Sequence, residues 1–143
     1  MSAATEVRVE KHFRHPPERV FDAFVDPGRA GDWLFRTSAG SLARCDYDPR
    51  PGGHFLIVED REGGPAHHWG EFIVLDRPHR IVFDFWVDEA DDERTRVTVD
   101  IRTSGDGCDV VLSHDLAPEW SDYADRSAAG WSMILDSLKG VLE

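Results

Sequence analysis

The amino-acid sequence predicts an α+β fold in which a curved antiparallel β-sheet wraps around one long C-terminal helix. Between about residues 42 and 116, short apolar runs alternate with turn residues, a pattern typical of an antiparallel meander. After residue 117, apolar residues recur every three or four positions, which is typical of an amphipathic helix of roughly six turns. The sheet has an apolar face that needs a cover, and only this helix is long enough to supply it.

The N-terminal segment predicts one strand followed by two short helices. Apolar and polar residues alternate over 6–13, and a period of two indicates a half-buried strand. The Pro16-Pro17 pair favours the first turn of a helix, which apolar residues continue at helical spacing over 20–25. The breaker sequence at 26–28 ends that helix, and we expect a second small helix from Arg29 to Trp33.

The central segment predicts a series of strands joined by short turns. A first strand runs from about Leu42 to the turn at 49–53. The strands after it are expected over His54–Glu59, His67–Leu75, Arg80–Val87, Arg94–Thr103 and Cys108–Leu116.

The register of two of these strands follows from the turn between them. If Arg77-Pro78 is a two-residue loop, Val74 lies opposite Ile81, Phe72 opposite Phe83 and Gly70 opposite Phe85, and cross-strand partners share a face. We therefore expect one set of residues to point at the helix, namely Phe72, Val74, Ile81, Phe83 and Phe85. The residues expected on the other face are Trp69, Glu71, Asp84 and Trp86, which places two like charges opposite each other.

The C-terminal helix is expected to begin near Ala117-Pro118-Glu119 and to continue to Leu142. Gly130 lies in its middle, where a glycine costs about 1 kcal/mol relative to alanine. We expect a packing reason for it: a close approach of helix to sheet, with the Trp131 ring filling the gap beside it. Trp131 is then buried and forms a wall or the floor of any cavity there.

The charge balance narrows the classes of partner. The chain has 143 residues, and 28 acidic residues against 16 basic ones give a net charge of −12. Such a surface repels nucleic-acid backbones and anionic membranes, so we expect neither as a partner. The N-terminus shows no signal sequence, no aliphatic or aromatic run is longer than the four residues of 72–75, and the two cysteines form no disulfide framework. We expect one cytoplasmic domain over 1–143, with its core at about 6–142.

No pattern of metal-binding or catalytic residues stands out. Among the seven histidines, His67 and His68 are adjacent on an expected strand, so they point to opposite faces and cannot chelate one ion. The sequence contains neither paired-cysteine nor His-Glu-x-x-His metal spacing, and no Gly-x-Ser-x-Gly nucleophile motif. We therefore expect no metal and no cofactor, and we assign no catalytic residue.

The chain resembles the START-like (SRPBCC, helix-grip) superfamily, and within it the domain named for activators of the heat-shock-protein-90 ATPase. The resemblance extends from about Val7 to Leu142. It rests on the order and spacing of several short pieces: 16–24 (PPERVFDAF), Asp26-Pro27, Trp33, 50–53 (RPGG) with Phe55, Gly70-Glu71, 78–83 (PHRIVF), and Gly130-Trp131 with Leu135 and Leu138. It implies the helix-grip fold, and relatives with this fold include chaperone activators, hydrophobic-ligand carriers and polyketide cyclases.

Three functions remain open from the sequence. The first is non-enzymatic binding of a small hydrophobic or amphipathic molecule in a cavity between sheet and helix. The second is docking on a chaperone partner, and the third is a cyclase or hydrolase activity with His114 and Tyr123 as the only candidate acid–base groups. His114 is either a hydrogen-bonded core residue or a polar group that orients a ligand.

The expected ligand-binding residues are mostly aromatic, because bulky rings with a few polar groups describe pocket walls as well as a core. They are Trp33, Phe55, Phe72, Phe83, Phe85, Leu112, His114, Tyr123, Ser127 and Trp131. The sequence predicts neither the identity of the ligand nor the oligomeric state.

Overall fold

The computed structural model describes residues 5–26, 28–34, 40–86, 95–116 and 124–142. Its elements follow the predicted order and are, along the chain, β1 (Thr5–Phe13), α1 (Pro17–Val25), α2 (Ala30–Trp33), β2 (Ser41–Tyr47), β3 (His54–Arg61), β4 (Gly64–Asp76), β5 (Arg80–Trp86), β6 (Thr95–Ser104), β7 (Gly107–Leu116) and α3 (Ala124–Leu142). The start expected for the last helix, at 117–119, lies outside the described residues.

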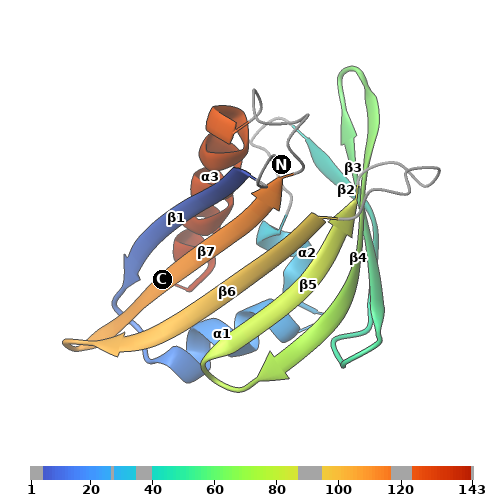
Figure 1. Ribbon diagram of the computed structural model, residues 1–143. Coiled ribbons are helices and arrows are strands. Elements are labelled where there is room, and N and C mark those ends of the chain that lie inside the picture. The colour runs from blue at the N-terminus through green and yellow to red at the C-terminus, as the bar shows by residue number, and fades with distance from the viewer. Residues whose placement is uncertain (1–4, 27, 35–39, 87–94, 117–123, 143) are drawn as a thin grey trace, which may run out of the picture.

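The strands form one antiparallel sheet in the order β1-β7-β6-β5-β4-β3-β2. The sheet is strongly curved, and the three helices lie on its concave side (Figure 1). α3 packs chiefly against β1, and α2 contacts both α3 and β2, so the helices bridge the two edges of the sheet. The predicted α+β helix-grip fold is confirmed.

α3 presents one apolar stripe to the sheet. Trp131, Leu135, Leu138 and Leu142 are all buried, and their spacing of three or four residues places them on one side of the helix. The expected burial of Trp131 is confirmed, with 4% of the residue exposed. The packing reason expected for Gly130 is wrong: it lies beside this stripe, and a Cβ added to it would meet nothing within 4 Å.

The register between β4 and β5 is as predicted at one end of the pair and different at the other. Phe72 pairs with Phe83, and Gly70 with Phe85. The loop is one residue longer than expected, because Asp76 pairs with Arg80, and an irregularity of pairing between Phe72 and Val74 takes up the extra residue.

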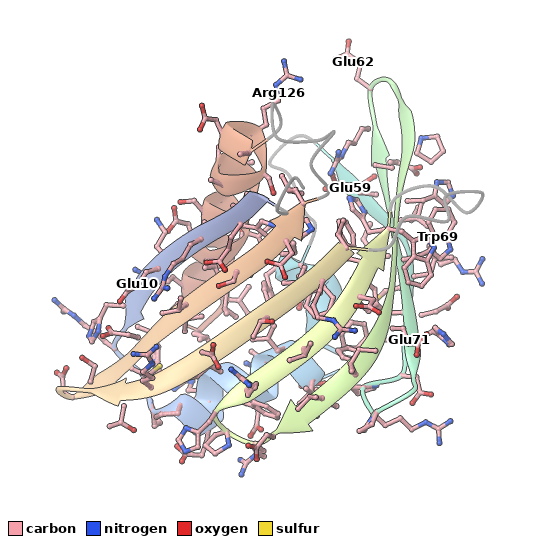
Figure 2. The ribbon with its side chains drawn as sticks, in the orientation of Figure 1. Glu10, Glu59, Glu62, Trp69, Glu71 and Arg126 are labelled. Atoms are coloured by element: carbon pink, nitrogen blue, oxygen red, sulfur yellow. The ribbon has the colours of Figure 1, made fainter. Side chains whose placement is uncertain are left out.

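The irregularity reverses the expected orientation of Val74. Val74 pairs with Val82 rather than Ile81 and is 38% exposed, so its expected inward orientation is wrong, whereas Leu75 pairs with Ile81 and packs on the core. Trp69 and Glu71 lie on the face of β4 away from α3, as predicted (Figure 2).

The like charges predicted to face each other do so, since Glu71 pairs with Asp84. Each carboxylate has a polar partner on a neighbouring strand, and for Asp84 that partner is a cation. His54 Nε2 lies 3.2 Å from Glu71, and the Arg96 guanidinium donates to Asp84 at 3.0 Å. Neighbouring strands therefore offset the repulsion that the β4–β5 pairing creates.

The core below the helix is built from aromatic rings. Phe55, Phe72 and Phe83 come from three adjacent strands, and their ring centroids lie 5.6–6.3 Å apart. Tyr47 packs on two of these rings and donates its hydroxyl to the carbonyl of Phe24. Such tilted and edge-on ring pairs favour a well-defined packing.

Gly70 is required by this packing, because a Cβ added to it would overlap the Phe55 ring from the paired strand. We expect Gly70→Ala to lower the free energy of unfolding by about 1–3 kcal/mol through overpacking. Gly63→Ala is the matched control, since nothing lies within 4 Å of its added Cβ; it should change stability by less than about 0.5 kcal/mol. Urea denaturation measures both, and equal effects would contradict the assignment.

Candidate functional site

Polar and aromatic side chains gather between α3 and the sheet, mainly where β5 ends and β6 begins. We call this group the polar cluster. It comes from β4, β5, β6, β7 and α3, and its members are His68, Phe85, Thr95, His114, Ser127 and Trp131.

His114 is the centre of the hydrogen bonds in the polar cluster. The Trp131 indole N–H donates to its Nδ1 at 3.0 Å, and because an indole only donates, Nδ1 is the unprotonated nitrogen. The proton of the neutral ring is therefore on Nε2, which donates to Thr95 Oγ1 at 2.7 Å. The Thr95 hydroxyl donates in turn to the Phe85 carbonyl at 3.1 Å. These bonds tie α3 to three strands.

Burial keeps the His114 ring neutral. The residue is 5% exposed, and desolvation lowers its pKa to about 4. Ser127 Oγ lies 3.3 Å from Nδ1, but Trp131 already donates to that nitrogen at a shorter distance. An imidazole with this pKa is a weak base near neutral pH, so His114 is poorly suited to activate the Ser127 hydroxyl.

His68 provides a second buried imidazole on the same face of the sheet. Its Nδ1 lies 3.1 Å from the carbonyl of Ile57, which can only accept, so Nδ1 carries the proton. Burial is the main cause that lowers its pKa to about 4. His67 points to the other face and stacks on Trp69, as expected for adjacent strand residues.

Phe85 joins the two imidazoles. Its ring lies parallel to the His68 ring at 6.2 Å and meets His114 and Trp131 edge-on at 5.9 and 6.2 Å. Phe85 is only partly buried, whereas Phe83, two residues before it, is 3% exposed. The partly accessible aromatic surface therefore begins at Phe85.

The structure divides the ten expected ligand-binding residues. Phe85, His114, Ser127 and Trp131 come together in the polar cluster. Five others are buried in the core, namely Trp33, Phe55, Phe72, Phe83 and Leu112, and Tyr123 lies outside the described residues. Trp33 packs edge-on against Phe24, and its buried indole nitrogen has no hydrogen-bond partner among the residues that the structure describes.

His68 and Thr95 belong to the polar cluster, but they are not among the ten residues expected from the sequence. Alternation along the strand places His68 on the same face as Gly70 and Phe72, so the sequence alone could have identified it as an inward-facing residue. No comparable signal existed for Thr95, because its role depends on its position beside His114 on the neighbouring strand.

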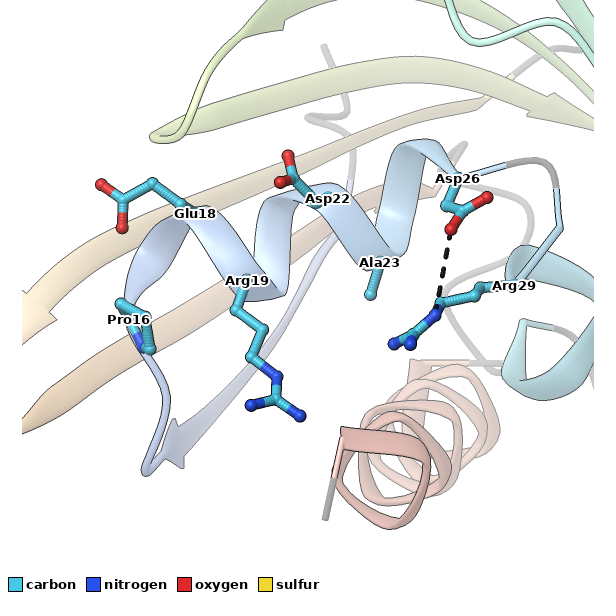
Figure 3. A pocket seen from close by; sticks show the side chains of 7 residues that line it. All are labelled: Pro16, Glu18, Arg19, Asp22, Ala23, Asp26 and Arg29. Carbon is cyan, nitrogen blue, oxygen red and sulfur yellow. Dashed lines mark ion pairs between the residues drawn. The ribbon is translucent and has the colours of Figure 1, made fainter.

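Three hollows that the described residues form lie elsewhere on the surface. A large one, of about 500 Å³, follows α1 and carries charges of both signs. In Figure 3, Glu18 and Asp22 lie on one side of α1, while Arg19 and Arg29 point toward α3. Arg19 donates to the Leu142 carbonyl at 2.8 Å, so part of this charge is already engaged. The cavity expected between sheet and helix stays a prediction.

Within the described ranges, no three histidine, cysteine, aspartate or glutamate side chains are grouped closely enough to hold a metal ion. No helix in the same ranges has both the length and the apolar character needed to cross a bilayer.

The two buried imidazoles predict how stability depends on pH. Their pKa is lowered to about 4 in the folded chain, so between pH 6.5 and 4 the unfolded chain binds more protons. The free energy of unfolding should therefore be highest above pH 6.5 and fall toward pH 4, by about 2–3 kcal/mol for each imidazole. In urea denaturation at several pH values, His114→Leu should be less stable than the wild type at pH 7 and show a shallower pH dependence. An unchanged pH dependence would contradict the assignment.

Solved structures with similar folds come from several bacteria. A protein from Rhodobacter sphaeroides is 25% identical, with a TM-score of 0.83 over 96% of this chain and 92% of that one. A protein from Chromobacterium violaceum is 21% identical, with a TM-score of 0.82 over 95% of each chain. The AHSA1-like protein from Aeromonas hydrophila is 23% identical, with a TM-score of 0.79 over 94% and 90%.

A search of curated proteins found no match to the chain. The family model described as "Activator of Hsp90 ATPase homolog 1-like protein" matches residues 14–143, which is most of the sequence. With the helix-grip fold described above, this match shows that the chain belongs to the family of Activator of Hsp90 ATPase homolog 1-like proteins.

Proposed function

We propose that this chain binds a small amphipathic molecule beside the polar cluster, between the sheet and α3, without transforming it. The observation that carries the proposal is the change in packing from Phe83 to Phe85. The Phe83 ring is buried in the aromatic core, whereas the Phe85 ring is partly exposed and lies among hydrogen-bonded polar groups. Aromatic walls with a few fixed polar groups are typical of small-molecule sites.

The polar cluster favours an amphipathic ligand over a purely apolar one. Phe85 supplies partly accessible apolar surface, and Ser127 and Thr95 are only partly buried. Because the hydrogen bond from His114 fixes the Thr95 hydroxyl in place, a ligand with one polar end meets a partly preformed arrangement.

An enzymatic function has less support from the geometry. Both hydroxyls of the polar cluster, those of Ser127 and Thr95, lie beside the same imidazole. That imidazole, His114, is buried, neutral and already bonded to Trp131. Its Nε2 donates to a neutral hydroxyl, so within the described ranges no third group strengthens it as a base.

A second candidate function follows from the description of the family. The name refers to activators of the Hsp90 ATPase, and a chain with a net charge of −12 suits a chaperone partner that presents a basic surface. In either function we expect a single cytoplasmic domain that needs no cofactor and binds neither nucleic acid nor membranes.

Binding can be tested with an amphipathic fluorescent probe, 1-anilinonaphthalene-8-sulfonate. We expect saturable one-to-one binding to the folded chain. Phe85→Ala should weaken it about tenfold, because a phenyl ring contributes about 1.5–3 kcal/mol when buried against an apolar group. Val74→Ala is the matched control: Val74 is exposed and points away from Phe85, so its loss should change affinity less than twofold. Equal effects of the two variants, or no saturation, would overturn the site.

The two alternative functions, hydrolysis and docking on a chaperone, predict different experimental results. Ester hydrolysis that disappears in Ser127→Ala would favour the enzyme. Stimulation of an Hsp90-class ATPase that Phe85→Ala leaves unchanged would favour the chaperone partner. We expect no hydrolysis above the buffer rate.

A further inference from the structure

We propose that another of the surface hollows binds a small doubly charged anion of the phosphate class. None of the residues that line this hollow belongs to the polar cluster. The hollow has a volume of about 290 Å³ and lies where the end of β1 meets the last turns of α3. It is lined by His12, Phe13, Arg14, His15 and Lys139. Four of these five residues are basic and none is acidic, although the chain as a whole has 28 acidic residues against 16 basic ones.

The cations of this hollow differ from most others in the chain. Among the described residues, the arginines paired with a carboxylate are Arg29, Arg44, Arg50, Arg61, Arg77, Arg80 and Arg96. Arg14 and His15 have no such partner in the part of the chain that the structure describes. The Lys139 ammonium lies 5.4 Å from the centroid of the Phe13 ring and is paired with no acid in the described ranges.

Two acidic residues whose partners line or adjoin the hollow, Asp109 and Asp136, are already engaged. Asp109 accepts from His12 at 2.7 Å, and this hydrogen bond is the main cause that lowers the pKa of Asp109. Asp136 on α3 pairs with Lys11 at 3.4 Å. Neither neutralises Arg14 or Lys139, so a locally positive potential remains on a chain that is negative overall.

The chemistry of the lining selects the class of ligand. A guanidinium offers paired donors that match two oxygens of one phosphate group, and an ammonium adds a point charge beside it. Lys139 alone would be explained by the negative end of the α3 dipole. Arg14 and His15 belong to the segment between β1 and α1, so that explanation does not account for them.

The proposal can be tested by titrating inorganic phosphate into the full chain and following it by NMR, at constant ionic strength and pH 7. We expect saturable shifts centred on residues 12–15 and 139. Arg14→Gln and Lys139→Gln should each weaken binding about tenfold, the effect of one lost hydrogen bond to a charged group. Shifts spread over the surface without saturation would overturn the proposal.

Two controls distinguish specific phosphate binding in the hollow from nonspecific attraction to any surface cation. Arg8→Gln removes an equivalent exposed cation from β1 outside the hollow, so it should change phosphate affinity less than twofold. Acetate should bind at least several-fold more weakly than phosphate, because it carries one charge. Equal losses in all three variants, or equal affinity for acetate, would overturn the proposal. The site shares no residue with the polar cluster, so Phe85→Ala should leave phosphate binding unchanged.

Discussion

The fold depends on covering the concave face of a seven-stranded sheet with one long helix. Six interstrand spacings make such a sheet about 29 Å wide if flat, whereas a helix with its side chains is only about 10–12 Å across. The sheet must therefore curl, and the short helices and large rings fill what α3 does not reach. This difference in width explains two features of the core. Large rings pack together at Phe55, Phe72 and Phe83, and α2 contacts both α3 and β2.

Trp131 is where this packing meets the candidate ligand site. One part of its ring contacts Phe83 in the core, while its N–H donates to His114. The same hydrogen bond assigns the tautomer of His114 and thereby orients the Thr95 hydroxyl. Stability and the arrangement of the polar cluster therefore depend on one side chain, so substitutions of Phe85, at the edge of the polar cluster, test binding more cleanly than substitutions of Trp131.

Local patterns predicted which residues lie inside, but not the irregularities that depend on distant partners. The period of two placed Phe72, Phe83 and Trp69 correctly. The same period could not show that the loop is one residue longer and that an irregularity beside Val74 compensates for it. The position of this irregularity depends on how β4 pairs with β5. The burial of Trp131 followed from helical spacing, whereas the role assigned to Gly130 failed because the sequence does not reveal the rotation of the helix relative to the sheet.

The histidines show why residue type alone did not identify the candidate sites. His68 and His114 are buried, and desolvation lowers the pKa of each to about 4, so they act as neutral hydrogen-bonding groups. His12 is exposed and bonded to Asp109, at the edge of a hollow whose cations have no acid among them. The same type of side chain thus helps to build a neutral, partly apolar site in one place, and in another it bonds a carboxylate beside exposed cations. Burial and the neighbouring carboxylates make the difference, and both are set by the tertiary fold.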